Sequence, residues 1–140
     1  MNKNNLINFK NIYGEETGII ELKYKDFQIK KSSIQVKNKF FDNNNDNDNY
    51  KGIIIFYAPW CKHCVELSSE FINLAQDNLY IFPIGAVNIE DVKNKNDKLA
   101  QKLKIEQIPT IKYIDSKGII REYPYEVSIE NLRYFINMNL

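Results

Sequence analysis

The chain has two cysteines, Cys61 and Cys64, and its single histidine, His63, lies between them. Thiols at this spacing can close a disulfide, inert or redox-active, or they can bind a metal ion. A structural zinc site usually needs four Cys or His ligands, so these three residues would need carboxylates or a second chain to complete one. The residue types and their spacing therefore favour thiol–disulfide chemistry, with an inert disulfide and a shared metal site as the alternatives.

The segments on either side of the cysteines place them at a strand-to-helix junction. The apolar run 53–55 predicts a buried strand, and apolar residues recur at helical spacing through 65–75. Two cysteines beside a pattern of this kind are typical of a redox-active pair. The sequence therefore predicts that a helix begins close to Cys61 and that Cys64 lies one turn later.

Three effects favour a thiolate at Cys61. The start of a helix carries unpaired N–H groups and a partial positive charge. Lys62 and His63 add positive charge within two residues of the thiol. Each effect lowers the pKa of a thiol from its usual value of about 8.5, so Cys61 is the expected reactive thiol, tuned by Lys62 and His63.

The stretch 56–64 reads Phe-Tyr-Ala-Pro-Trp-Cys-Lys-His-Cys and resembles the active site of the thioredoxin superfamily, in particular its protein disulfide isomerase branch. A second motif, Ile108-Pro109-Thr110, follows at a spacing that this superfamily uses. The resemblance runs from about residue 19 to the C-terminus. It implies an α/β, thioredoxin-like fold, in which a central mixed β-sheet is flanked by helices on both faces.

The resemblance also implies roles for the residues of both motifs. Cys61 is the nucleophile that attacks a substrate disulfide, Cys64 resolves the mixed disulfide, and this redox-active pair serves in place of any cofactor or metal. The peptide bond before Pro109 is expected to be cis, which turns the backbone of Ile108 toward the cysteines. Trp60, Ile108 and Pro109 are the expected substrate-binding residues, with the Ile108 backbone pairing with an extended substrate segment.

The implied function is that of a thiol–disulfide oxidoreductase of the protein disulfide isomerase type, which forms, reduces or reshuffles protein disulfides. His63 occupies the position at which thioredoxins carry proline. A histidine there favours the reduced form of the cysteine pair, so we expect a more oxidising couple. The alternatives are a thioredoxin-like disulfide reductase and a binding module that turns over poorly. The expected partners are proteins with thiols or disulfides, together with an electron donor or acceptor.

Composition and charge argue against other classes of partner. A net charge of +1 over 140 residues implies no general attraction to nucleic acid or to anionic membranes. No apolar run approaches the ~20 residues that span a bilayer, and the first ten residues do not resemble a secretory signal. We therefore expect an intracellular, cytoplasmic protein. The abundance of Asn, Lys and Ile, whose codons are AT-rich, is compatible with a protist or a large DNA virus, and a viral source would add the virion as a location.

Three positions depart from the pattern of the superfamily. The buried acid expected six residues before the first cysteine is replaced by Ile55, the lysine beside it by Ala86, and the arginine expected before the last helix by Val127. In the superfamily these groups help to move a proton from the second cysteine. The sequence therefore predicts that Cys64 loses its proton slowly near neutral pH, which would limit turnover.

The chain divides into a leader and one domain. Residues 1–18 are expected to be irregular, and residues 19–140 to form a single thioredoxin-like domain. Within the domain, the Asn- and Asp-rich stretch 42–49 is expected to be a flexible loop rather than a calcium site, because it lacks the glycine and the final glutamate of an EF-hand. Phe40 and Phe41, just before this loop, are expected to anchor the chain.

Hydrophobic periodicity predicts the remaining elements. A first strand is expected at 19–24, and Asp26 is expected to cap a helix that follows it, although 32–37 alternates like a strand. In chain order, the later elements are a strand within 79–88 parallel to 53–56, a helix at 97–103 capped by Asp97, a hairpin of 110–115 with 119–123, and a helix at 128–138 capped by Ser128.

Overall fold

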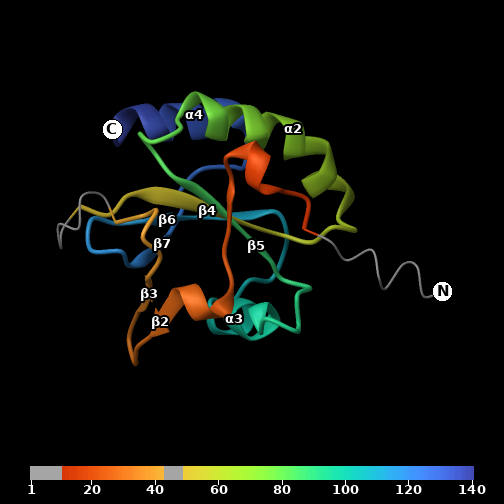
Figure 1. Ribbon diagram of the computed structural model, residues 1–140, viewed down its shortest axis with the longest axis vertical. Coiled ribbons are helices and arrows are strands. Elements are labelled where there is room, and N and C mark those ends of the chain that lie inside the picture. Colours follow the sequence, from red (N-terminus) through yellow and green to blue (C-terminus); the bar gives the residue numbers. More distant parts are fainter. Residues whose placement is uncertain (1–10, 43–48) are drawn as a thin grey trace.

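A computed structural model describes residues 11–42 and 49–140. These residues build a five-stranded mixed sheet with the strand order β1-β5-β4-β6-β7 (Figure 1). The strands are β1 (Ile20–Glu21), β4 (Gly52–Tyr57), β5 (Ile84–Asn88), β6 (Thr110–Ile114) and β7 (Ile120–Glu122). β1, β5 and β4 run parallel to one another, while β6 runs antiparallel to both β4 and β7. The predicted parallel pair and the predicted C-terminal hairpin are therefore confirmed.

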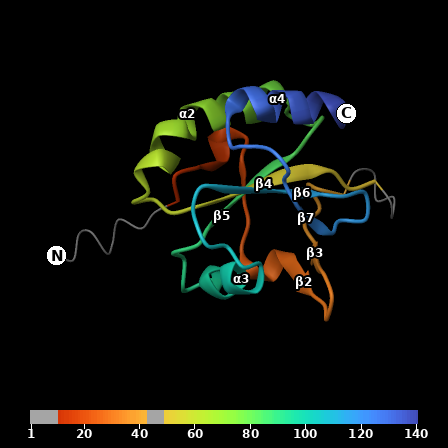
Figure 2. The same ribbon diagram turned by 180° about the vertical axis from the view of Figure 1, so that it is seen from behind.

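Helices cover both faces of this sheet, as expected (Figures 1 and 2). α2 (Lys62–Asp77) and α4 (Ile129–Met138) lie side by side on one face. On the other face lie α3 (Asn96–Lys102) and a small two-stranded sheet of β2 (Phe27–Ile29) and β3 (Ile34–Val36). The sheet is thus the middle layer of three.

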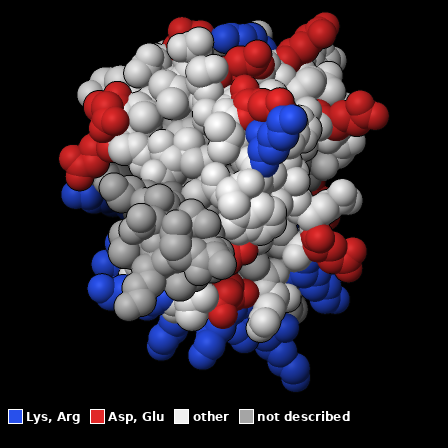
Figure 3. Space-filling model, turned by 90° about the vertical axis from the view of Figure 1, so that its right-hand side faces the viewer, with Lys and Arg blue, Asp and Glu red and all other residues white. Residues whose placement is uncertain are grey.

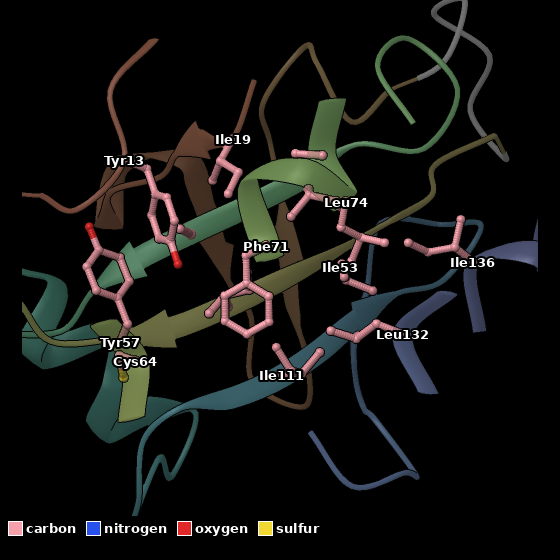
Figure 4. Close-up of a cluster of buried hydrophobic side chains, with 14 of the residues drawn as sticks. Tyr13, Ile19, Ile53, Tyr57, Cys64, Phe71, Leu74, Ile111, Leu132 and Ile136 are labelled. Carbon is pink, nitrogen blue, oxygen red and sulfur yellow. The ribbon is translucent and has the colours of Figure 1, made fainter. Parts of the chain in front are cut away.

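β4 is the central strand, and all six of its residues are buried. Its side chains alternate between two cores: Ile55 and Tyr57 pack against α2 and α4, whereas Ile54 and Phe56 pack on the α3 side. Figure 4 shows the first of these cores, in which side chains of β4, α2 and α4 meet. Complete burial of an aliphatic or Phe side chain contributes roughly 1.5–3 kcal/mol, so β4 is firmly held, and the residues at its C-terminal end are held with it.

The prediction of a helix after Asp26 is wrong, because this segment forms a β-hairpin instead. Residues Tyr24–Asp26 make one 3-10 turn, η2, in which the Asp26 carboxylate accepts a hydrogen bond from a backbone N–H three residues earlier (2.8 Å). β2 and β3 then pair antiparallel, with Phe27 opposite Val36 and both side chains buried. Only in a strand do alternating apolar residues all face one side. The alternating pattern therefore outweighs the capping preference of Asp26, which closes a turn instead of starting a helix.

Asp97 does not cap α3, contrary to expectation. The helix begins at Asn96, and Lys95 before it has a left-handed φ of 64° and makes no side-chain cap. Asn96 is buried, where its Oδ1 accepts a hydrogen bond from Tyr24 N (3.0 Å) and its Nδ2 donates to Asn88 O (3.0 Å). A buried asparagine is needed here because the backbone N–H of Tyr24 would otherwise lack a partner.

The N-terminal part of the described chain is irregular apart from the 3-10 turn η1 (Glu15–Thr17). Tyr13 is nevertheless only 2% exposed, and its ring packs edge-on against Tyr57 with the ring centroids 5.2 Å apart. The first strand is shorter than predicted, since it covers only Ile20–Glu21. Close packing therefore begins at least as early as Tyr13, six residues before the position at which the domain was expected to start.

Two smaller predictions concern single side chains. Phe41 is completely buried, but Phe40 is 59% exposed. Only Phe41 therefore anchors the chain. Ser128 caps α4 as predicted, because its Oγ accepts a hydrogen bond from Asn131 N (3.1 Å). The predicted leader up to residue 10 and most of the predicted Asn/Asp loop (43–48) lie outside the described residues.

Candidate active site

The two cysteines lie where β4 passes into α2. Cys61 is the N-cap residue of α2, with an extended backbone (φ −73°, ψ 112°), and Cys64 lies in the first turn. The Cys61 sulfur accepts a hydrogen bond from Cys64 N at 3.3 Å. A helix start has backbone N–H groups without partners, and a side chain at the N-cap satisfies one of them. The predicted junction is therefore confirmed, with one sulfur at the positive end of the helix.

The two thiols are free, and they differ in their surroundings. Cys61 is 6% exposed and Cys64 only 1% exposed, so the first has the greater access to solvent. Burial, and after it the hydrogen bond with the Cys61 side chain, raises the pKa of Cys64 to about 12. Cys64 therefore stays protonated at neutral pH unless another group takes its proton.

The second motif meets the first at Cys61. The Ile108–Pro109 peptide bond is cis, as expected. The backbone oxygen of Ile108 lies 3.9 Å from the Cys61 sulfur, although 47 residues separate the two in sequence. Ile108 and Pro109 are both partly exposed.

Three further residues of the first motif face solvent. Trp60 is 59% exposed, and Lys62 and His63 are exposed on the first turn of α2. The start of α2 is on the right in Figure 1, and Figure 3 shows that side of the molecule. Uncharged side chains fill much of the middle of this side, Asp and Glu predominate above, and Lys and Arg gather along the lower edge. Trp60 is therefore a large exposed apolar group next to Cys61 in the chain.

At the three positions where the sequence departs from the superfamily pattern, the structure has packed apolar side chains. Ile55 is completely buried and pairs in register with Ala86 on β5. Val127 packs against the core on the α2 and α4 side. The two nearby arginines are engaged elsewhere, Arg121 with Asp115 (2.9 Å) and Arg133 with Asp77 (3.0 Å). These positions therefore place no buried charge next to Cys64.

Sequence reasoning missed a polar cluster on the α2 side of the sheet, in which the half-buried Glu21 meets the buried Tyr57 and Tyr13. Tyr57 OH donates a hydrogen bond to Glu21 Oε1 (2.5 Å) and accepts one from Ile12 N (3.2 Å). Burial raises the pKa of Glu21 to about 7. The sequence contained a signal for the position of Glu21. Glu21 lies two residues after Ile19, so in a strand both side chains face the same side of the sheet, and Ile19 lies in the core on the α2 side.

The described residues offer neither a metal site nor a membrane-spanning helix. Within residues 11–42 and 49–140, no three His, Cys, Asp or Glu side chains come together in a way that could hold a metal ion. None of the helices in the same ranges is long and apolar enough to cross a membrane.

A known protein family matches most of the chain. The family model described as Thioredoxin matches residues 32–138. The chain belongs to the thioredoxin family. Its three-layered architecture and mixed sheet are those of a thioredoxin domain, as the resemblance of the two motifs implied.

Several relatives of this thioredoxin domain are named protein disulfide-isomerases. Protein disulfide-isomerase MPD1 of Saccharomyces cerevisiae is 40% identical over 73 residues, which cover 52% of this chain and 22% of that protein. The protein disulfide-isomerase of Datisca glomerata is 29% identical over 117 residues, covering 82% of this chain and 21% of that protein. The chain thus spans about a fifth of the length of these relatives. It is a thioredoxin domain of the protein disulfide isomerase-like kind.

Solved structures share the fold at low sequence identity. The J-Trx1 fragment of ERdj5 has a TM-score of 0.63 at 22% identity, covering 89% of this chain and 53% of that one. Thioredoxin f2 of Chlamydomonas reinhardtii has a TM-score of 0.62 at 19% identity, covering 86% of this chain and 95% of that one. At these identities the likeness is one of fold alone.

Proposed function

We propose that this thioredoxin domain is a thiol–disulfide oxidoreductase of the protein disulfide isomerase type that acts on protein thiols and disulfides. The observation that carries the proposal is the contrast between the two sulfurs. The Cys61 sulfur sits at the N-cap of α2, whereas Cys64 is buried beneath it with a raised pKa. A two-step exchange requires one sulfur that meets the substrate first and a second that is held in reserve as a thiol.

The exchange runs in two balanced steps. The thiolate of Cys61 attacks one sulfur of a substrate disulfide, the substrate S–S bond breaks, and the other substrate sulfur leaves as a thiolate. Cys64 then loses its proton and attacks the Cys61 sulfur, which releases the second substrate thiolate and leaves an intramolecular disulfide. Two electrons pass from the domain to the substrate, and the reverse sequence oxidises a substrate dithiol. A separate thiol or disulfide partner must reset the domain after each turnover.

Substrate would bind across Trp60, Ile108 and Pro109. Ile108 is partly exposed, and its backbone would pair with an extended substrate segment as an added strand. The 3.9 Å between its oxygen and the Cys61 sulfur would bring such a segment directly to the nucleophile. Trp60 adds an exposed apolar surface beside the same thiol.

Lys62 and His63 would act through their positive charge. Both are exposed on the first turn of α2, so their attraction for a thiolate is weakened by solvent and falls with added salt. By favouring the thiolate they favour the reduced form, which makes a couple more oxidising. Replacing His63 with Pro, the residue of thioredoxins at this position, should therefore lower the reduction potential.

A second function, capture of partners without rapid turnover, is favoured by one observation. Ile55, Ala86 and Val127 are packed as apolar residues where the superfamily pattern has an acid, a lysine and an arginine. A domain without these groups would still form mixed disulfides but would resolve them slowly.

Two measurements separate these functions. Wild type should accelerate both the reduction of insulin and the refolding of a scrambled disulfide protein, whereas Cys61→Ser should do neither. Background rates for wild type in both assays would favour partner capture. The reduction potential then identifies the direction, because a value near that of thioredoxin (about −270 mV) indicates a reductase and one near that of protein disulfide isomerase (about −180 mV) an oxidase or isomerase.

A further inference from the structure

Positive charge is concentrated on one side of the molecule, although the net charge is only +1. Segments 23–37 and 89–106, which include η2, the β2–β3 hairpin and α3, carry ten lysines and five acidic residues. Nine of these lysines are exposed, four in the first segment and five in the second, whereas Glu106 is the one acid of the two segments that is exposed. The surface formed by these nine exposed lysines is the basic face.

The two segments of the basic face lie together on one side of the sheet. Asn96, at the start of α3, accepts a hydrogen bond from Tyr24 N in η2 (3.0 Å). Lys and Arg gather along the lower edge of Figure 3, on the side of α3, and Asp and Glu lie above them. On α2 and α4 the exposed acids outnumber the exposed Lys and Arg by four to two. A composition rich in lysine would place lysines on both faces, so composition alone does not explain the asymmetry.

α3 directs its lysines away from the core. Lys95, Lys98 and Lys102 recur at spacings of three and four residues, so they follow one side of the helix, while Leu99 is completely buried. Lys95 and Lys104 flank the helix in the left-handed conformation, with φ of 64° and 56°. Glycine and asparagine adopt this conformation more readily than lysine does. The backbone therefore does not explain why both positions are lysine.

The charges of the basic face are not neutralised by ion pairs within the described residues. Three ion pairs occur there, and none includes a lysine of this face. Two acids of the same segments bind uncharged groups instead. Asp26 accepts a hydrogen bond from Lys23 N (2.8 Å), and Asp91 accepts two from Asn94, at its backbone N (3.1 Å) and its Nδ2 (2.8 Å). The basic face therefore attracts an anionic surface, even though the whole molecule is close to neutral.

The side chains of the basic face favour an anionic lipid bilayer over a nucleic acid. Both arginines of the chain, the preferred residues for recognition of nucleic acids, lie outside the face and are paired with acids. Binding of single strands also uses exposed aromatic side chains, and segments 23–37 and 89–106 expose no Phe, Tyr or Trp. Dispersed lysines suit a bilayer, because anionic lipids attract each basic group near their surface. Val92, 65% exposed, adds an apolar side chain to the same segment.

We propose that the basic face docks on lipid bilayers that contain anionic lipid, with α3 and the β2–β3 hairpin toward the headgroups. This inference does not rest on the proposed function, because none of the lysines that it uses belongs to the active site. α2 and α3 lie on opposite faces of the sheet (Figure 1). A domain docked in this way therefore holds Cys61, at the start of α2, away from the headgroups and open to proteins near the membrane surface.

Sedimentation with vesicles tests the docking. The full chain is mixed with vesicles of phosphatidylcholine alone and with vesicles of phosphatidylcholine and phosphatidylserine. The chain should sediment with the second kind only. Binding should weaken as salt is raised from about 0.1 to about 1 M, because the Debye length falls from about 10 to about 3 Å. Equal binding to both kinds of vesicle, or binding to neither, would overturn the proposal.

A pair of variants with the same change in net charge locates the contact. Lys98→Gln/Lys102→Gln removes two positive charges from α3 and should lower the vesicle partition coefficient about 30-fold. Asn73→Glu/Asn137→Glu adds two negative charges at exposed positions of α2 and α4 and should change it much less, because the sheet separates these charges from the bilayer. Equal weakening by both variants would show that net charge, and not the basic face, determines binding.

A second pair of lysines keeps the test independent of the folding of one variant. Lys30 and Lys31 lie between β2 and β3, and both are exposed. Lys30→Gln/Lys31→Gln should also weaken binding to vesicles that contain phosphatidylserine, with far-UV circular dichroism like that of wild type. Unchanged binding in this variant would overturn the part assigned to the hairpin.

Two further measurements test the choice of partner and the orientation. A DNA duplex and polyglutamate, each at the same concentration of anionic groups as the phosphatidylserine, should bind the chain more weakly than the vesicles do. Tighter binding of either would overturn the choice of a bilayer. Iodoacetamide should alkylate Cys61 in Cys64→Ser at the same rate with and without saturating vesicles, and protection by vesicles would overturn the orientation. Vesicle binding should persist in Cys61→Ser, so loss of thiol exchange and loss of docking are distinguishable.

Discussion

Cys61 and Cys64 carry the same thiol group, and their positions three residues apart give them different surroundings. Cys61 occupies the N-cap of α2, next to the Ile108 backbone. Cys64 points into the core, where burial raises its pKa to about 12. At pH 8 a thiol with that pKa is ionised in only about one molecule in ten thousand. The division of labour between the two residues therefore follows from where the strand ends and the helix begins.

Alkylation should reveal this difference directly. Cys64→Ser, which keeps Cys61, should react rapidly with iodoacetamide at pH 7–8, because the remaining thiol is at the helix start. Cys61→Ser, which keeps Cys64, should react slowly throughout that range and speed up only toward pH 10 and above. Rapid alkylation of Cys61→Ser together with slow alkylation of Cys64→Ser would reverse the assignment.

Glu21 should also make the stability of the domain depend on pH. Its pKa is raised from 4.5 to about 7 in the folded state, so the folded state holds this proton more tightly than the unfolded state. The free energy of unfolding should therefore fall as pH rises from about 4.5 to 7, by up to about 3 kcal/mol from this group. Urea titrations at pH 5 and pH 8 measure the fall, and Glu21→Gln should remove most of it. An equal fall in wild type and Glu21→Gln would assign it to other groups.

A carboxyl group placed at position 55 should supply a base for Cys64. Ile55 is completely buried and pairs in register with Ala86, so neither position carries a charge. Ile55→Glu should lower stability, because a buried carboxylate without a lysine partner is costly, yet it should speed resolution of the mixed disulfide at pH 7, with little gain at pH 9. Ile55→Gln, of matched size, should not speed it. An equal or slower rate for a folded Ile55→Glu protein would contradict this account of position 55.

Among the elements, the segment between β1 and β4 departs most from expectation. A single Asp suggested a helix cap, but the alternating apolar residues of β2 and β3 bury Phe27 and Val36 on one side of a hairpin. Local capping is worth about 1 kcal/mol, less than the burial of two large apolar side chains. The start of α3 follows the same logic, because the buried Asn96 rather than Asp97 satisfies neighbouring backbone groups.

Asn96 should therefore be a structural residue of the face opposite the thiols. Asn96→Ala leaves Tyr24 N without its partner, whereas Asn88 O keeps the hydrogen bond from Asp91 N (3.1 Å). A buried group left without a partner costs about 1–3 kcal/mol. We therefore expect a loss of about 1–3 kcal/mol in the free energy of unfolding by urea, with the alkylation rate of Cys61 nearly unchanged. Asn73→Ala, an exposed change on α2, is the matched control and should be close to neutral. A loss below about 1 kcal/mol for Asn96→Ala would show that these contacts matter little.

For the whole molecule, the sequence predicts the parallel pairing of β4 with β5, the C-terminal hairpin and the helices α2 and α4, because strongly periodic segments determine them. The resemblance of the two motifs adds the cis peptide bond. The parts that it does not predict depend on contacts between distant residues. Glu21 and Tyr57 are 36 residues apart, and only the parallel pairing of β1 with β5 brings the carboxyl group onto the thiol side. The shared parity of Ile19 and Glu21 indicates the face of the sheet on which this side chain lies, but a strand of two residues does not indicate that Tyr57 is its partner.

The central claim is that Cys61 exchanges disulfides with protein substrates and that Cys64 resolves them. The most direct measurement is to incubate reduced Cys64→Ser with a scrambled disulfide protein and to separate the products without reductant. A one-to-one adduct should accumulate, dissociate on addition of dithiothreitol, and map to Cys61, while wild type should hold it only briefly and Cys61→Ser should form none. Absence of an adduct in Cys64→Ser, or equal amounts in both single variants, would contradict the claim.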